Sequence, residues 1–111
     1  MGPFFWNIFP SLLLAAISLV IYLYPPKKIN HMYGYRTRRS MASQEKWDFA
    51  NRLNLKLFWW ITLILFLLGC AVHYTMTFGV AQMTLYLAMV VLLVLIIPIT
   101  ERALKKEFED E

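Results

Sequence analysis

Apolar residues along this chain gather in three long blocks, at residues 4–24, 55–74 and 80–99. Each block has about 20 residues, and a helix of that length rises about 30 Å, the thickness of the hydrocarbon core of a bilayer. The one formal charge inside the blocks is Lys56, at a block end where its stem can reach the headgroups. The pattern predicts an all-α integral membrane protein, with three transmembrane helices in a single domain over residues 1–111.

Prolines mark the expected ends of two helices. Proline lacks the amide hydrogen that a helix interior needs, so we expect the first helix to bend at Pro10 and to end at Pro25. For the same reason the third helix is expected to end at Pro98. Thr100 is then placed to cap a short charged helix in the tail 100–111.

The polar segment 25–54 between the first two blocks holds a further helical signal. Ser43 is a preferred N-cap residue, and Glu45 follows in the first turn, where a negative charge favours the helix dipole. No glycine or proline follows until well inside the second block. We therefore predict an amphipathic helix that runs into, or is hinged to, the second crossing, with Asp48 and Arg52 spaced to pair on one side of it.

Composition and charge indicate the class of protein and its orientation. The chain is 59% hydrophobic and only 16% charged, whereas a soluble domain is about half apolar and a quarter charged. The net charge of +4 does not indicate nucleic acid, because the excess lies in segment 25–56, whose balance is +6, while residues 75–79 carry no charge. The positive-inside rule places segment 25–56 in the cytoplasm, against anionic lipid headgroups, with the N-terminus outside and the C-terminus inside.

Few residues suggest catalysis or metal binding. Cys70 has no partner for a disulfide, and His31 and His73 belong to opposite faces of the membrane in this topology. No nucleophile–base set, phosphate-binding loop or zinc motif is present. We expect no cofactor and no enzymatic activity. Because three helices bury little surface between them, we expect a homo-oligomer.

The stretch 33–52 contains residue types that bind anions or form tight turns. Gly34, between two tyrosines, suits a backbone with positive φ. Arg36 supplies a two-pronged donor, and Thr37 and Ser40 add hydroxyl groups, a set that suits a phosphate or a carboxylate. At a cytoplasmic leaflet the nearest such anion is a lipid headgroup.

Several of these residues allow two interpretations. Arg36 is either a lipid-facing charge or half of an ion pair with Glu45 or Asp48. Trp47 is interpreted as an anchor at headgroup depth, with a specific packing role as the alternative. Asn51 lies near a membrane boundary and can hydrogen-bond to another helix. The remaining basic residues of the segment are interpreted as plain orientation charges: Lys27, Lys28, Arg38 and Arg39.

Taken together, the spacing of these residues resembles the signature of the SdpI family of small bacterial membrane proteins, which lies between the first two membrane helices. The main departure from it is Arg38, where the family usually has proline. The matching positions form our candidate binding site for a ligand or partner: Gly34, Tyr35, Arg36, Thr37, Ser40, Ser43, Glu45, Trp47, Asn51 and Arg52.

The resemblance implies an immunity protein of the bacterial plasma membrane. The founding member protects its producer from a secreted peptide toxin that collapses the membrane potential, and it captures a cognate repressor at the membrane. Our leading hypothesis is therefore immunity to, or sensing of, a membrane-active peptide. The alternative is a small protein that binds anionic lipid or remodels membranes. A third hypothesis is a membrane-surface enzyme in which Glu45 and Arg36, in a partly dry site, do acid–base work.

Overall fold

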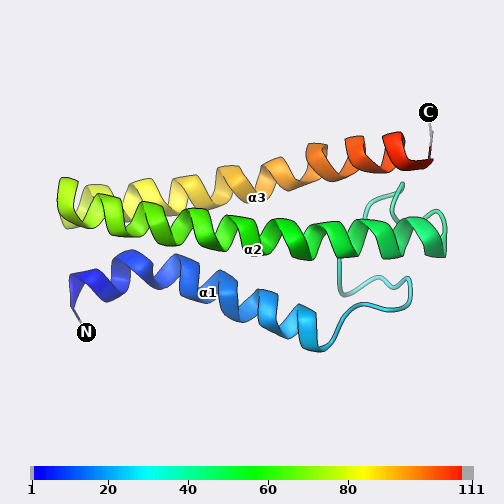
Figure 1. Cartoon of the computed structure of the whole chain (residues 1–111), viewed down its shortest axis with the longest axis horizontal. Coiled ribbons are helices and arrows are strands. Elements are labelled where there is room, and N and C mark those ends of the chain that lie inside the picture. The colour runs from blue at the N-terminus through cyan, green and yellow to red at the C-terminus, as the bar shows by residue number, and fades with distance from the viewer. Residues whose placement is uncertain (1, 109–111) are drawn as a thin grey trace.

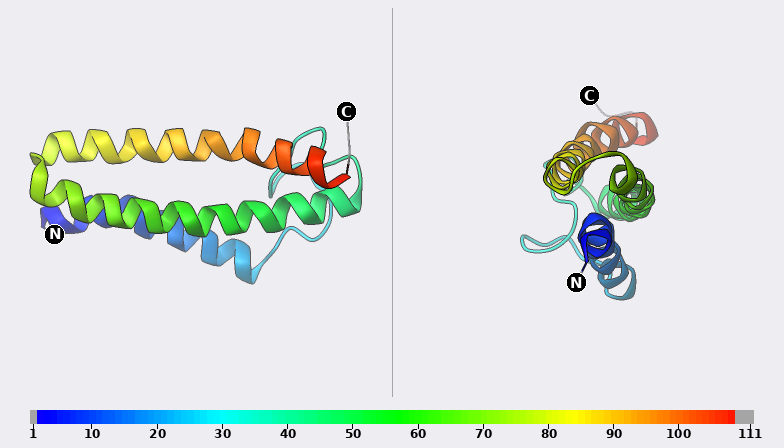
Figure 2. Two further views of the ribbon diagram at one scale, coloured as in Figure 1. Left: turned by 45° about the horizontal axis from the view of Figure 1, so that its top comes forward. Right: turned by 90° about the vertical axis from the view of Figure 1, so that its left-hand side faces the viewer.

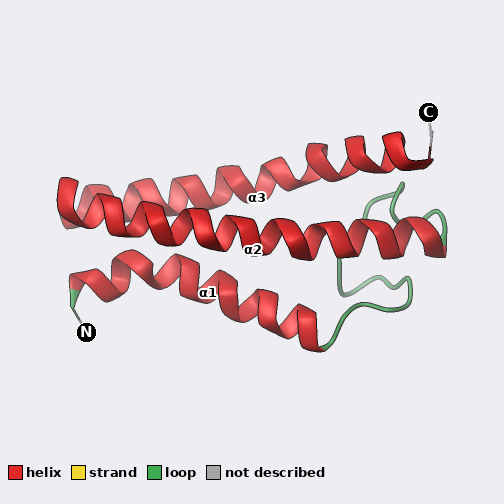
Figure 3. Ribbon diagram, in the orientation of Figure 1, coloured by secondary structure: helices red, strands yellow, loops and turns green. Residues whose placement is uncertain are grey.

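The computed structural model describes residues 2–108, which form three helices joined by a long and a short connection (Figures 1 and 3). The helices are α1 (Pro3–Leu23), α2 (Gln44–Thr75) and α3 (Phe78–Phe108), and none of the residues described is in a strand. Each helix is long and apolar enough to cross a membrane. The prediction of an all-α chain with three helices of transmembrane length is confirmed.

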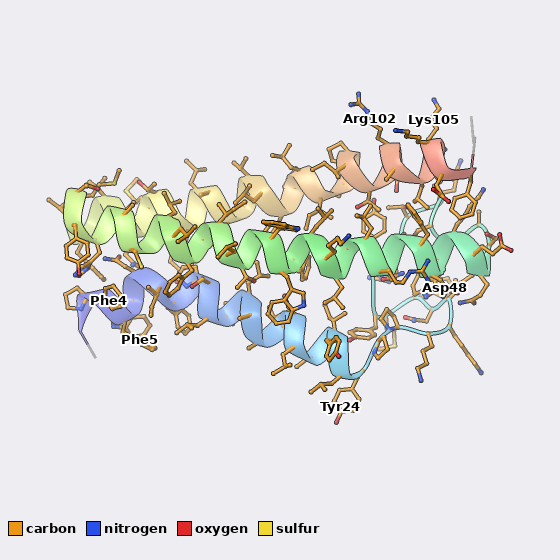
Figure 4. All side chains as sticks on the ribbon, viewed as in Figure 1. Phe4, Phe5, Tyr24, Asp48, Arg102 and Lys105 are labelled. Atoms are coloured by element: carbon orange, nitrogen blue, oxygen red, sulfur yellow. The ribbon has the colours of Figure 1, made fainter. Side chains whose placement is uncertain are left out.

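Successive helices run in opposite directions, so the bundle has two distinct ends (Figures 1 and 2). One end, called here the turn end, holds the start of α1 and the short connection between α2 and α3. The other, called the loop end, holds the long connection 24–43 and the last turns of α3. Figure 4 shows the aromatic Phe4 and Phe5 at the turn end and the charged Arg102 and Lys105 at the loop end.

The helices differ in length, and this difference creates a platform at the loop end. α1 has 21 residues, which rise about 30 Å and match a hydrocarbon core. α2 has 32 residues and α3 has 31, and the bundle extends 47 Å along its longest axis. Since all three helices meet at the turn end, α2 and α3 continue beyond α1 at the loop end, and connection 24–43 lies beside these extra turns (Figure 1).

α2 begins at the residue that the sequence favours. Ser43 Oγ accepts a hydrogen bond from the Lys46 amide at 3.2 Å, and Glu45 lies in the first turn, so the predicted N-cap is confirmed. The helix then continues without interruption to Thr75. The residues for which the sequence predicts an amphipathic helix are therefore the first turns of α2, with no hinge between them and the rest of the helix.

Proline affects α1 as expected. The helix ends at Leu23, because Pro25 disfavours the helical conformation in the residue before it. Pro10 lies inside the helix and is buried against the bundle. Figure 1 shows α1 changing direction in its N-terminal half.

The expectation for the third helix is wrong. α3 contains Pro98 and continues to Phe108, so the charged tail does not form a separate helix capped by Thr100. Ile96 and Thr100, on either side of the proline, are both buried, so packing against the bundle holds the helix together there. Transmembrane helices tolerate proline where neighbouring elements compensate for the lost hydrogen bond.

Large apolar side chains cover the outside of the bundle. Val20 on α1, Leu67 on α2 and Leu87 on α3 are 52%, 59% and 66% exposed. A soluble monomer rarely presents such extensive apolar surface, whereas a membrane protein packs it against lipid. The exposed apolar sides of all three helices support the assignment as a multi-pass membrane protein.

At the turn end, a glycine lets α1 lie directly on α2. A methyl group added at Gly69 would overlap the carbonyl oxygen of Asn7, so the backbones approach closely at this point. The side chain of Asn7 is buried and lies 3.1 Å from His73 Nδ1. Its Oδ1 accepts a hydrogen bond from Gln82 Nε2 at 2.8 Å. One polar side chain of α1 thus contacts both other helices.

We predict that Gly69→Ala destabilises the bundle, because the new methyl group forces α1 away from α2. Overpacking of this kind costs roughly 1–3 kcal/mol. The measurement is the helix content of purified protein during titration with sodium dodecyl sulfate. Gly79→Ala is the matched control, because no atom lies within 4 Å of the added group there. Equal unfolding midpoints for the two variants would contradict the close contact.

Candidate functional site at the loop end

Glu101 on α3 holds connection 24–43 against the bundle. Its Oε2 accepts hydrogen bonds from the hydroxyl groups of Tyr35 at 2.7 Å and Thr37 at 2.9 Å. Its Oε1 lies 3.6 Å from Nε of Arg39. We call these four residues the Glu101 cluster. Hydrogen bonds to a carboxylate are stronger than those between neutral groups, so one side chain of α3 fixes three residues of the connection.

Ser40 gives this part of the connection its shape. The side chain is fully buried, and its Oγ accepts a hydrogen bond from the Thr37 amide at 2.8 Å and lies 3.0 Å from the Tyr35 carbonyl oxygen, to which it donates. In return the Ser40 amide donates to Thr37 Oγ1 at 3.1 Å. The two hydroxyl groups expected to hold an external anion therefore serve the turn itself, and the anion near them is the protein's own Glu101.

Asn51 binds the connection from α2. Its Oδ1 accepts a hydrogen bond from the Tyr35 amide at 2.6 Å, and its Nδ2 donates to the Trp47 carbonyl at 3.0 Å. Gly34, just before Tyr35, has φ of 106°, which confirms the prediction of a positive φ. A Cβ atom at Gly34 would lie 2.8 Å from Asn51 Oδ1 and 2.9 Å from the Pro26 ring. Glycine is thus needed here for its conformation and for its small size.

Trp47 connects α2 to the beginning of the connection. Its side chain is fully buried, and Nε1 donates a hydrogen bond to the Pro26 carbonyl at 2.5 Å. The interpretation as an anchor at headgroup depth is therefore wrong, and the packing alternative is correct. Gln44 adds a second bond of this kind, from Nε2 to the Lys27 carbonyl at 2.7 Å. The first turns of α2 thereby hold both the start and the middle of the connection.

The charged members of the candidate site lie apart from the Glu101 cluster. The guanidinium of Arg36 is exposed and donates to the carbonyl of His31. No ion pair joins it to Glu45 or Asp48 in the described part of the chain, and the expected Asp48–Arg52 pair does not form there either. Glu45 and Arg52 are exposed. The side chains of Asp48 and Arg52 instead line a small cleft of about 150 Å³.

Two residues of this site, Glu101 and Arg39, are not predicted from the sequence. Glu101 was assigned to the charged tail, although it is the first acid after the third apolar block and belongs to the same end as the polar segment. Arg39 was interpreted as a plain orientation charge, which is wrong because it faces Glu101. The other three residues of that group are exposed: Lys27, Lys28 and Arg38.

The site does not provide metal ligands in the usual arrangement. Within residues 2–108, no three side chains of His, Cys, Asp or Glu lie close enough to hold a metal ion. His31 lies in the connection at the loop end, and His73 lies at the turn end, where it contacts Asn7. The chemistry of the loop end is therefore hydrogen bonding around one carboxylate.

We predict that Glu101→Gln loosens the connection. The amide keeps the shape of the side chain but loses the charge that attracts Arg39 and strengthens two hydrogen bonds, a loss of roughly 1–2 kcal/mol for partly exposed groups. Limited trypsin digestion should then cut faster after the arginines of the connection. Glu107→Gln, at an exposed position of the same helix, is the control. Equal cleavage rates in the two variants would show that the Glu101 cluster does not hold the connection.

Because of Tyr35, the stability of the folded chain depends on pH in the alkaline range. Burial and the adjacent Glu101 carboxylate raise the pKa of the Tyr35 phenol well above its ordinary value near 10. Above about pH 10 the unfolded chain loses this proton while the folded chain keeps it, so the free energy of unfolding falls as the pH rises further. Tyr35→Phe should show a shallower decline above pH 10 than the native chain. Tyr74→Phe, at a position 81% exposed, should leave the decline unchanged.

Comparison with known proteins shows a family and one informative relative. An uncharacterised protein of Bacillus subtilis (strain 168), YfhL, is 51% identical over 45 residues, which are 40% of this chain and 41% of the relative. This chain therefore matches only about two fifths of the length of that relative. No solved structure matches the chain. The model of the SdpI/YfhL protein family matches residues 27–100, which include the Glu101 cluster except Glu101 itself. Since that match covers more than half of the sequence, the chain belongs to the SdpI/YfhL protein family.

Proposed function

We propose that this chain protects a bacterial cell from, or senses, a membrane-active peptide. Membership of the SdpI/YfhL family supports the proposal, because immunity to a secreted peptide toxin is what the resemblance of segment 34–52 implies. The protein would act in the bacterial plasma membrane. The basic connection, with its balance of +6 over residues 25–56, would face the cytoplasm according to the positive-inside rule.

The observation that carries the proposal is that connection 24–43 bonds to α2 and α3 at the same time. Asn51 of α2 holds the backbone of Tyr35, and Glu101 of α3 holds its side chain. The same connection follows directly from α1, and Trp47 holds its first residues. A peptide that enters the membrane and changes the spacing of the helices would therefore shift the connection, in the way that helix shifts change packed contacts in known switches.

A cytoplasmic partner, such as a captured repressor, would meet the exposed side chains of the connection and of the first turn of α2. Arg36, Arg38 and Glu45 point to solvent at the loop end and are not part of the Glu101 cluster. Charged residues at such a rim favour rapid association with a partner of complementary charge. A second copy of the chain is a further proposed partner, because the exposed apolar sides of the helices can pack against each other in a membrane.

We predict that expression of the chain in sensitive bacteria preserves their membrane potential against at least one member of a panel of membrane-active peptides. The measurement is the fluorescence of a potential-sensitive dye after addition of peptide, together with survival. Asn51→Leu and Glu101→Gln should lose most of the protection, because each releases the connection from one helix. Unchanged killing across the panel in cells with the native chain would refute the proposed function.

Two controls separate loss of function from loss of protein. Membrane fractions must contain each variant at the level of the native chain. Ala42→Ser changes an exposed residue of the connection that takes no part in the hydrogen bonds of Asn51 and Glu101, so it should protect as well as the native chain. If this control fails along with the two test variants, the connection tolerates no change and the specific role of the two contacts is wrong.

A further inference from the structure

Two cavities lie on either side of the same residues of α2 near the loop end. One has a volume of about 450 Å³ and extends along α1 over residues 16–21. The other has a volume of about 410 Å³ and extends along α3 over residues 93–97. Gly34, Asn54 and Phe58 line both cavities. Figures 1 and 2 show α1 diverging from the other helices toward this end.

Among the residues that line these cavities, Asn54 has a side-chain amide that is available to bind a ligand. It is only 8% exposed, and the hydrogen bonds of residues 2–108 include none from its side-chain amide. Its polar atoms stay accessible, because the sealed side-chain polar atoms without a partner in residues 2–108 belong to Arg39 and Thr100. Both cavities reach this side chain, so a polar group of a bound molecule can supply the missing hydrogen bonds.

The depth of Asn54 matches the boundary between headgroups and hydrocarbon. Along α2 it lies about 30 Å from Thr75 at 1.5 Å per residue, which is the thickness of a hydrocarbon core. Toward the turn end the walls become apolar, with Phe58 one turn deeper on α2 and Leu93 on α3. A molecule that fits has a polar group at the level of Asn54 and a hydrocarbon part beyond it.

The charge at the outer rim of the cavities indicates the sign of the ligand's charge. Arg36 and Thr37 line the cavity beside α3 at its loop end, and none of the described residues that line either cavity is acidic. The hydroxyl of Thr37 is engaged by Glu101, whereas the exposed guanidinium of Arg36 has more donors than its one bond to His31 uses. The rim therefore suits a phosphate group.

We propose that these two cavities bind an anionic phospholipid from the leaflet that faces connection 24–43. Arg36 contacts the phosphate, Asn54 donates to an ester carbonyl, and the acyl chains lie along α1 and α3 on either side of Phe58. This site is separate from the proposed protection against peptides, and it is tested on purified protein without any peptide.

The test measures lipid retained by the full chain. The protein is reconstituted in bilayers of equal parts phosphatidylglycerol and phosphatidylcholine with identical acyl chains, extracted in mild detergent, and weighed by native mass spectrometry. The native chain should retain phosphatidylglycerol in preference to phosphatidylcholine. Arg36→Gln should reduce that preference about fivefold, the factor that one basic residue at an anionic membrane surface contributes. Arg38→Gln, an exposed arginine outside the cavities, should keep it.

A second pair of variants tests the cavities themselves. Ala16 is an exposed residue of α1 at the wall of the larger cavity, so Ala16→Phe fills that space with little risk to folding. It should lower the retention of both lipids, as should Asn54→Leu. Ala71→Phe, at an exposed position of α2 outside the cavities, should leave retention unchanged.

Three results would overturn the proposal. Equal loss of preference in Arg36→Gln and Arg38→Gln would mean that diffuse surface charge attracts the lipid. Unchanged retention in Ala16→Phe would mean that the lipid binds elsewhere. Equal retention of phosphatidylglycerol and phosphatidylcholine by the native chain would mean that the cavities do not select an anionic headgroup. Circular dichroism verifies the helix content of every variant, and Ala16→Phe carries the test if Asn54→Leu does not fold.

Discussion

The carboxylate of Glu101 is the interaction on which the loop end depends. Polar groups that pack against a membrane protein near the bilayer have little access to water. A polar connection packed there therefore needs hydrogen-bond acceptors from the protein itself. Glu101 accepts from Tyr35 and Thr37 and attracts Arg39. Without it the buried phenol of Tyr35 would keep only a weaker contact of 3.3 Å with the Ile97 carbonyl. A single acidic residue of α3 thereby holds the basic connection packed against the bundle.

This interaction is possible because the helices have unequal lengths. α1 is just long enough to span a hydrocarbon core, whereas α2 and α3 continue past its end by several turns. Those extra turns carry Trp47, Asn51 and Glu101, which between them bind the connection at three points. Three residues of the family signature therefore share a structural reason. Tyr35, Trp47 and Asn51 hold the connection against the parts of α2 and α3 that extend past α1.

The helices are predicted well from the sequence because features close together in the chain determine them. Block length gives the crossings, and the side chain of Ser43 caps the helix beside it. The sequence also predicts the positive φ of Gly34, since a glycine in such a polar stretch is typical of a tight turn. The partners of Trp47 and Glu101 are not local. Pro26 and Tyr35 lie 21 and 66 residues from them along the chain, and no periodicity or charge count relates residues at that distance. Pro98 was misjudged for the same reason, because buried neighbours keep its helix intact.

Gly34 is the residue of the connection that lines both cavities. Gly34 presses against Asn51 and Pro26 on one side, and it lines both cavities on the other. Its neighbour Tyr35 belongs to the Glu101 cluster and also lines the cavity beside α3. Interfaces packed this closely shift between discrete arrangements more readily than they deform. A molecule bound in either cavity would therefore lie against the same stretch of backbone that Asn51 and Glu101 hold in place.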